Sequence, residues 1–469
     1  MRVRVGALAL AVFSGCVAPR VSALPKGFHW GVATSGFQSE GSFPDSNWTR
    51  YAARPESGHE PYGNSVDFHA RFRDDVALAA SLGVDTFRFS IEWARVMPRR
   101  GEVDEAALQH YDELFDAIAA QGMTPMPTLL HFVTPGWVLD DGGLASDAIV
   151  SGFREFVEVV ARRYRGRRAR WITLNEASYF LTLERRHGSL REDEVDAAKA
   201  RLVAMHALAF ELLHRHDPGA PVSSNVVWEP APASWFDDWF FDRVREQLDY
   251  IALDYYYALT LDLSVAHAAR GKFWRVNFRP SALLLALRDY HQRAPHLPLY
   301  VVENGMATDD GLPRRDGYTR SQHLRDHVYW LQRARRRARR HRLQLLVAHR
   351  QLRVGRLPQP LRALHRRRAH RPGPAAQAHR RGRGAERVGE AGRGAGRLFA
   401  GEVTHVPASG FFGSDFGAAP DRSTLARSVT PAKRLASSAA AASSRLSSSF
   451  TAAFSRATSF WSFCSTAMA

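Results

Sequence analysis

The sequence predicts a (β/α)8 barrel, the TIM-barrel architecture, over residues 25–333, and three observations indicate this fold. First, strand-length apolar or β-branched runs alternate with helix-length amphipathic stretches, which is typical of a parallel sheet covered by helices. Second, seven such runs occur in this region, which fits a barrel better than a doubly wound sheet. Third, no Gly-x-Gly-x-x-Gly follows the first run, which argues against a dinucleotide-binding sheet.

The predicted elements follow one another in a regular order. Strands are predicted where apolar and β-branched residues cluster, at residues 28–35, 86–93, 125–132, 171–176, 222–228, 250–257 and 299–303. Helices are predicted where amphipathic stretches lie between these runs, at residues 66–82, 105–121, 145–164, 193–215 and 281–292. A further helix begins after Thr319, and the alternating pattern ends near residue 333.

The basic character of the chain comes from one segment. The net charge is +17, but residues 334–400 alone hold 20 arginines against two glutamates, so the rest is close to neutral. A nucleic-acid-binding role for the whole protein is therefore not expected, and an Arg-rich nucleic-acid-binding tail is a weaker alternative because the segment lacks interleaved aromatic residues. Residues 334–469 are low in complexity, so we expect a disordered basic tail there.

The N-terminus has the pattern of an export signal over residues 1–23. A basic start precedes a short apolar stretch, and Val21-Ser-Ala23 resembles a small-residue cleavage site. A lipid anchor at Cys16 is the alternative, because the residues before it loosely match a lipoprotein box. The other cysteine is Cys464, so no disulfide framework is expected. We expect a secreted or periplasmic protein with no membrane span.

Two of the apolar runs end on a glutamate. Glu176 follows Asn175, whose amide can hold a sugar hydroxyl, and Glu303 precedes an Asn-Gly turn that would expose its side chain. One protonated and one ionised carboxyl group are the minimal machinery of glycoside hydrolysis. A single glutamate at a strand end is ordinarily a solvated end, but two Asn-Glu or Glu-Asn pairs at the ends of strands favour catalysis.

Five segments carry a resemblance to a known family. In chain order they are Phe28-His-Trp-Gly-Val-Ala-Thr-Ser-Gly-Phe-Gln38, Phe87-Arg-Phe-Ser-Ile-Glu-Trp93, Leu129-Leu-His131, Thr173-Leu-Asn-Glu176 and Val302-Glu-Asn-Gly305. Together they resemble the motifs of glycoside hydrolase family 1, the β-glucosidase family. The resemblance implies a (β/α)8 barrel and a retaining double displacement that requires no metal and no organic cofactor.

The resemblance also implies a role for each matched residue. Glu176 is expected to be the acid/base and Glu303 the nucleophile. Arg88 is expected beside Glu303, where it would help to keep the carboxyl group ionised. The expected substrate-binding residues are Gln38, His131, Asn175, Arg88 and Tyr256. Taken singly, each of these has an ordinary alternative, such as a buried ion-pair partner, a core histidine or a loop amide.

The chain departs from the family pattern at three positions near the expected site. Ala177 stands where the family usually has proline, and Phe132 stands where it usually has tryptophan. The sixth strand, which usually ends in Asn-Tyr-Tyr, here reads Asp254-Tyr-Tyr256. An extra carboxyl group near Glu303 would raise a pKa in the site or would pair with Arg88, and the sequence leaves both alternatives open.

The family motif of the eighth strand is missing. That motif reads approximately Gly-Tyr-x-x-Trp-Ser-Leu-x-Asp-Asn-x-Glu-Trp, and its Glu and Trp bind the 4- and 6-hydroxyl side of the sugar. Residues 343–355 read Leu-Gln-Leu-Leu-Val-Ala-His-Arg-Gln-Leu-Arg-Val-Gly instead. We therefore expect an incomplete barrel whose first and seventh strands have unpaired edges, and a polypeptide that folds poorly or is nearly inactive.

A shift of reading frame explains the missing motif. One permitted set of codons for residues 343–355, read one nucleotide later, encodes Tyr-Ser-Tyr-Trp-Ser-Leu-Thr-Asp-Asn-Tyr-Glu-Trp. We interpret residues 334–469 as an out-of-frame tail that arose in the gene or in its sequencing. Resequencing the locus tests this interpretation, because an uninterrupted frame through codon 334 contradicts it.

The sequence thus predicts a retaining β-glycosidase that hydrolyses terminal β-D-glucosides of small molecules or oligosaccharides. A β-galactosidase or β-fucosidase is an alternative, because sugar choice depends partly on the lost eighth-strand residues. A non-catalytic sugar-binding pseudoenzyme is the alternative from another class. Substrates phosphorylated at the 6-position are not expected for an exported protein.

Overall fold

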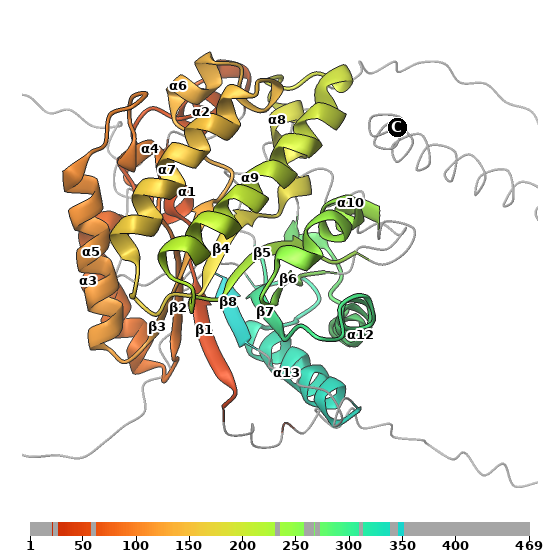
Figure 1. Ribbon diagram of the computed structural model, residues 1–469. Helices are drawn as coiled ribbons and strands as arrows, with labels where there is room; N and C mark the ends of the chain where they lie inside the picture. The colour runs from red at the N-terminus through yellow and green to blue at the C-terminus, as the bar shows by residue number, and fades with distance from the viewer. Residues whose placement is uncertain are drawn as a thin grey trace, which may run out of the picture.

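The structure is a computed structural model that describes residues 21, 27–57, 62–229, 235–257, 267, 273–308, 313–337 and 346–350. Within these residues, eight parallel strands close a barrel in chain order, from β1 to β8 (Figure 1). The strands are β1 (His29–Ala33), β2 (Thr86–Ser90), β3 (Thr124–Leu130), β4 (Trp171–Asn175), β5 (Val222–Val227), β6 (Ile251–Asp254), β7 (Leu299–Asn304) and β8 (Leu346–Arg350). The predicted (β/α)8 barrel is confirmed.

Helices lie outside the strands, as Figure 1 shows for α3, α5, α7 and α9. The long helices are α3 (Phe68–Ser81), α5 (Glu105–Ala120), α7 (Ala148–Tyr164), α9 (Val195–His216), α12 (Leu283–Arg293) and α13 (Arg320–Arg337). The shorter helices are α1 (Gly36–Ser39), α2 (Asn47–Ala52), α4 (Trp93–Val96), α6 (Gly136–Asp140), α8 (Ala177–Arg186) and α10 (Trp235–Val244). The predicted helices correspond to the long ones within a few residues, whereas the shorter ones were not predicted.

Two hydrophobic clusters form the core of the described residues. The inner cluster is formed by residues of β3, β4, β6 and β7, together with the residue that precedes β6. Its members are Met126, Ile172, Tyr250, Ala252, Tyr300 and Val302. The larger cluster lies between the strands and the helices and includes Phe87 and Phe89 of β2. Because strand side chains alternate between the two faces, Arg88 between these two phenylalanines points toward the barrel interior.

The eighth strand corrects one prediction. The sequence predicted that it would be missing, but Leu346–Arg350 pairs in parallel with both β1 and β7. The backbone of this segment thereby supplies hydrogen-bonding partners to two strand edges that would otherwise be unpaired. The barrel also runs past the predicted boundary at residue 333, since α13 ends at Arg337 and β8 follows. The segment carries neither the Glu nor the Trp of the expected motif.

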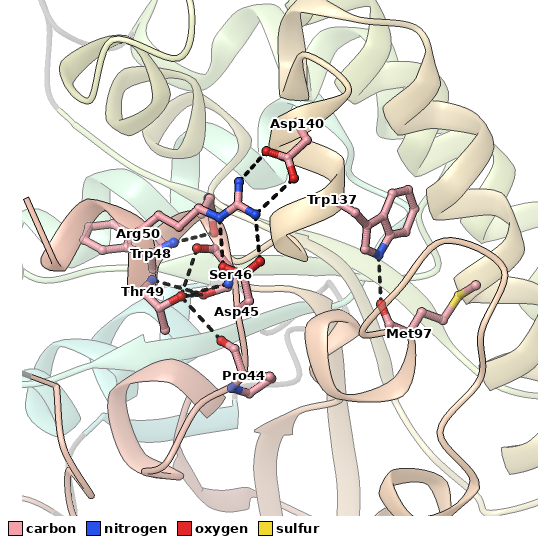
Figure 2. Close-up of polar contacts among 10 residues, drawn as sticks. Pro44, Asp45, Ser46, Trp48, Thr49, Arg50, Met97, Trp137 and Asp140 are labelled. Carbon is pink, nitrogen blue, oxygen red and sulfur yellow. Dashed lines mark hydrogen bonds and ion pairs between the residues drawn. The ribbon is translucent and has the colours of Figure 1, made fainter.

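The segments that follow β1 and β3 are held together beside the carboxyl ends of the strands. Arg50 of α2 bonds Asp45 at 2.7 Å and Asp140 of α6 at 2.5 Å, and Figure 2 shows its guanidinium between the two carboxylates. Ser46 caps α2, since its hydroxyl accepts from the backbone N–H of Thr49 at 3.1 Å. These contacts join two loops that lie far apart in sequence.

Two predicted segments lie largely outside the described residues. The predicted export signal over residues 1–23, with the alternative lipid anchor at Cys16, is described only at residue 21. The predicted tail is described only up to residue 337 and over residues 346–350. Among the helices of the described ranges, none combines the length and the apolar character needed to cross a lipid bilayer.

Candidate active site

Arg88 is the centre of a buried polar network at the carboxyl ends of the strands. It lies on β2 and is 0% exposed. Its Nη1 donates to Oε1 of Glu303 at 2.5 Å, and its Nε donates to the hydroxyl of Thr128 at 3.1 Å. Its Nη2 donates to Oδ1 of Asn175 at 2.6 Å. Because every nitrogen of the guanidinium has an acceptor, the group is held in one position while buried.

Glu303 is held at both carboxyl oxygens. Oε1 accepts from Arg88, and Oε2 accepts from the hydroxyl of Tyr256 at 2.6 Å. The side chain of Glu303 is 1% exposed. A carboxylate with a charge-assisted bond to one oxygen and a hydroxyl donor on the other is fixed in orientation, which a nucleophile toward one carbon atom requires.

A register shift directs Glu303 to this position. Tyr300 and Val302 of β7 belong to the inner cluster, so strict alternation would turn Glu303 toward the outer face. The structure instead has register shifts between β6 and β7, and between β7 and β8, at the end of these strands. Such irregularities re-aim a side chain, and here Glu303 reaches Arg88 in the barrel interior.

Glu176 follows β4 directly and is the N-cap residue of α8. Its backbone has a φ of 39°, in the left-handed region that residues other than glycine seldom adopt. The side chain is buried, and the backbone N–H donates to the carbonyl oxygen of Asn225 at 3.1 Å. Strained backbone of this kind concentrates at functional sites, where the surrounding structure holds it in place. Glu176 is close enough to Asp254 to act on it electrostatically, which places both carboxyl groups in one site.

A pair of amide side chains links the charged residues. Asn225 of β5 donates from Nδ2 to Oδ1 of Asn175 at 2.8 Å and also to Asp254. Its own Oδ1 accepts from Nη2 of Arg88 at 3.3 Å. Asn175 and Asn225 are opposite each other in the parallel pairing of β4 with β5. The network therefore continues from β2 through β4 and β5 to β6.

Asp254 ends β6 and is 0% exposed. Burial raises the pKa of Asp254 well above its usual range, and the negative charges of Glu303 and Glu176 raise this pKa further. The charge of Arg88 and the hydrogen bond from Asn225 act in the opposite direction. No hydrogen bond joins Asp254 to Arg88 among the described residues, so the first of the two sequence alternatives, a raised pKa, is the one that this geometry favours.

His131 and Gln38 both lie just after strands, at the carboxyl end of the barrel. His131 follows β3 directly and is 5% exposed, with its ring edge-on to Phe132 at 5.0 Å. Gln38 lies on α1, just after β1, and is half-buried; its backbone carbonyl accepts from the hydroxyl of Ser65 at 2.7 Å. The contacts that both side chains would make to a sugar stay predictions.

The sequence reasoning missed two members of the network, Thr128 and Asn225. Thr128 lies within the predicted third strand, and Asn225 lies within the predicted fifth strand. A polar residue inside an otherwise apolar strand is the signal that points to such positions, because burying it requires a hydrogen-bonding partner. Both side chains are buried, and both bond Arg88.

The arrangement can support acid/base and nucleophilic chemistry with two carboxyl groups at one strand edge. Glu303 is fixed by donors on both oxygens, and Glu176 lies in the same site at the start of a helix. In the part of the chain that the structure describes, no group of three or more His, Cys, Asp or Glu side chains is arranged as metal ligands.

Comparisons with known proteins agree with this geometry. Residues 21–231 match the family model described as Glycosyl hydrolase family 1. The aryl-phospho-beta-D-glucosidase BglC of Bacillus subtilis (strain 168) is 30% identical over 221 residues, which cover 44% of this chain and 46% of that protein. Thermostable beta-glucosidase B of Thermobispora bispora is 36% identical over 198 residues, covering 40% of this chain and 41% of that protein.

Solved structures share the fold over a longer range. A beta-glycosidase named BGL167 aligns with a TM-score of 0.57 and 25% identity, covering 69% of this chain and 87% of that one. The beta-glucosidase of Thermotoga maritima in complex with castanospermine aligns with a TM-score of 0.58 and 22% identity, covering 69% and 88%. In sequence, the chain spans less than half the length of the two curated relatives named above. Residues 21–231 are thus similar in sequence to glycosyl hydrolase family 1, and the barrel is similar in fold to solved beta-glycosidases.

Proposed function

We propose that the protein is a retaining β-glycosidase of the β-glucosidase type. The observation that carries the proposal is the Glu303 carboxylate, which Arg88 and Tyr256 hold at 2.5 and 2.6 Å in a buried site that also contains Glu176. Two carboxyl groups in one site, one of them fixed as an anion, are what a double displacement requires. The names of the relatives, beta-glucosidases among them, support the same reaction class.

In this mechanism, Glu176 donates a proton to the glycosidic oxygen while Glu303 attacks the anomeric carbon. The bond to the leaving group breaks, and a covalent glycosyl-enzyme forms on Glu303. Glu176, now ionised, then takes a proton from water as that water attacks the same carbon and releases Glu303. We expect the two carboxyl groups to lie about 5–5.5 Å apart, the separation typical of retention.

The decisive experiment uses two forms of the protein. The chain as written and a version with Tyr-Ser-Tyr-Trp-Ser-Leu-Thr-Asp-Asn-Tyr-Glu-Trp in place of residues 343–354 are assayed on aryl β-D-glucosides, β-D-galactosides and β-D-fucosides. We expect the second form to turn over faster and to discriminate better between glucoside and galactoside, because the resemblance implies that this motif binds the 4- and 6-hydroxyl side. Absence of β-glycoside hydrolysis in both forms contradicts the proposal.

The aryl β-glucoside 6-phosphate belongs in the same assay. One relative is named an aryl-phospho-beta-D-glucosidase, whereas the N-terminal pattern of this chain predicts export. We propose that the unphosphorylated glucoside is the preferred substrate and that the protein is secreted or periplasmic. N-terminal sequencing of the mature protein tests the export proposal, since a start near residue 24 supports it and a retained Met1 contradicts it.

A sugar-binding pseudoenzyme is the second candidate. It is favoured by the segment Leu346–Arg350, which closes the barrel without the Glu and Trp of the expected motif, and by a relative named probable inactive beta-glucosidase 25. That Arabidopsis thaliana protein is 34% identical over 188 residues, covering 36% of this chain and 35% of that one. Sugar binding without turnover in both forms of the protein would support this candidate.

Replacing Glu176 with glutamine is expected to separate substrates by their leaving group. An alkyl β-glucoside needs the proton that Glu176 donates, so its hydrolysis is expected to fall by about 10²–10⁴-fold. Formation of the glycosyl-enzyme from an activated aryl glucoside needs little proton donation and is expected to change far less, which a burst of phenol release measures. An equal fall in glycosyl-enzyme formation for both substrates contradicts the acid/base role.

A further inference from the structure

Asp254 stands directly beside the proposed nucleophile. It is the partner of Glu303 in the parallel pairing of β6 with β7, and the N–H of the next residue, Tyr255, donates to the carbonyl oxygen of Glu303 at 3.0 Å. The side chain of Asp254 is fully buried. A second carboxyl group therefore lies next to Glu303 without access to bulk water.

The two oxygens of Asp254 are unequally satisfied. Oδ2 accepts a hydrogen bond from the amide of Asn225. Oδ1 is buried and has no hydrogen-bond partner within the described part of the chain. An ionised carboxylate buried with one unpartnered oxygen is far more costly than a neutral carboxylic acid in the same place.

The charges around Asp254 also disfavour an additional anion. Three ionisable groups act on it electrostatically: Glu303 from β7, Glu176 from the end of β4 and Arg88 from β2. The neighbour from β5 is Asn225, which is uncharged. Arg88 directs Nη1 to Glu303 and its other nitrogens to Thr128, Asn175 and Asn225, and none of these bonds reaches Asp254.

We propose that Asp254 is a positioning residue that works as a neutral carboxylic acid. While it carries its proton, Arg88 stays bonded to Glu303, and the amides of Asn225 and Asn175 keep their orientation. When it ionises at higher pH, the new charge competes with Glu303 for Arg88, and turnover falls. The kinetic part of this inference rests on the proposed glycosidase function, whereas the proton on Asp254 does not.

The expected effect of pH on stability follows from the direction of the shift. Burial first, and then the charges of Glu303 and Glu176, raise the pKa of Asp254 in the folded protein well above its usual value. In the unfolded chain the pKa of an aspartate is about 3.9. The folded state therefore binds the extra proton, so this contribution to stability is complete below about pH 4 and is lost as pH rises through the folded value.

The test compares the wild-type full chain with Asp254→Asn and with a control. Asparagine is neutral at every pH, can still accept from Asn225, and is the residue that the resemblance implies at this position. The control is Asp237→Asn, a buried acid on α10 whose pKa burial raises to about 6 and whose Oδ2 accepts from the N–H of Val227 at 2.7 Å. Asp237 is not among the groups with the largest effects on the pKa of Asp254.

Two measurements are made on each variant. The first is kcat/KM for an aryl β-glucoside against pH. In Asp254→Asn, the pH at which kcat/KM falls on the alkaline side is expected to rise by about one pH unit or more. The second is the Tm against pH above about pH 6, which is expected to fall less steeply in Asp254→Asn than in the wild type. Asp237→Asn is expected to leave the alkaline limb unchanged and to alter the Tm slope only close to pH 6, where the raised pKa of Asp237 itself lies.

An unchanged alkaline limb together with an unchanged Tm slope in Asp254→Asn overturns the inference. If the Tm of Asp254→Asn falls less steeply with pH but the alkaline limb of kcat/KM is unchanged, the positioning role is overturned. Failure of the proposed function is distinguishable from both results: no variant then hydrolyses the glucoside, while the Tm comparison still decides whether Asp254 is protonated in the folded protein.

Discussion

Replacing Glu303 with glutamine is expected to abolish hydrolysis of aryl β-glucosides, with kcat lowered by at least about 10⁴-fold. An amide cannot form the covalent glycosyl-enzyme, so the double displacement loses its first step. Glutamine can still accept from Arg88 and can still bond Tyr256, which at present meet the two oxygens of Glu303 at 2.5 and 2.6 Å. The folded barrel is therefore expected to persist, with a lower Tm because the buried Arg88 loses its anionic partner, and circular dichroism and the Tm measure both.

Glu102→Gln is the matched control for this prediction. Glu102 is half exposed and pairs with Arg99 three residues earlier, so its replacement is expected to leave both turnover and Tm close to those of the wild type. Turnover by Glu303→Gln within tenfold of the wild type would show that another group is the nucleophile. The assignment of Glu303 would then be wrong, although the buried network would remain.

Replacing Arg88 with methionine is expected to destabilise the fold by about 3–5 kcal/mol and to remove activity. Methionine fills much of the space but leaves the buried carboxylate of Glu303 without its cation, and it removes the hydrogen bonds that Arg88 donates to Asn175 and Thr128. Removing one partner of a buried ion pair costs much more than the pair contributes. Urea unfolding at neutral pH measures the loss of free energy.

The loss is expected to be smaller at low pH, because protonation of Glu303 removes the uncompensated charge. Arg73→Met is the control, since Arg73 pairs with Glu113 on the surface, with side chains 64% and 41% exposed, and its removal is expected to cost about 0–1 kcal/mol. An Arg88→Met protein as stable as the control contradicts the claim that this ion pair holds the site together.

Most of the strand positions were predictable because parallel strands in a barrel are buried on both faces. Such strands leave continuous apolar runs in the sequence, and the predicted runs at residues 171–176 and 299–303 correspond to β4 and β7 within a residue. The short helices left no comparable pattern. Contacts across the chain hold α8, for example, where Glu184 accepts from Asn47 at 3.0 Å and from Tyr51 at 2.9 Å.

Closure of the barrel was predicted wrongly because the prediction relied on a side-chain motif. Strand pairing uses backbone N–H and C=O groups, which every residue except proline supplies in full. The segment Leu346–Arg350 therefore pairs with β1 and β7 although its sequence does not resemble the expected strand. The sugar-binding side chains of that motif cannot be supplied in this way.

Sequence order alone was sufficient to locate the two glutamates, because each terminates an apolar run, and to associate them with a family of glycosidases. Tertiary structure decided how they are held. Register shifts at the ends of β6 and β7 turn Glu303 inward, where strict alternation would have turned it outward. Only the closed barrel brings Arg88, Asn225 and Asp254 from three separate strands into one buried network, where burial and mutual charge govern their protonation. The protonation states and the hydrogen bonds of this network depend on distances between residues that are remote in the chain, and no local sequence pattern encodes such distances.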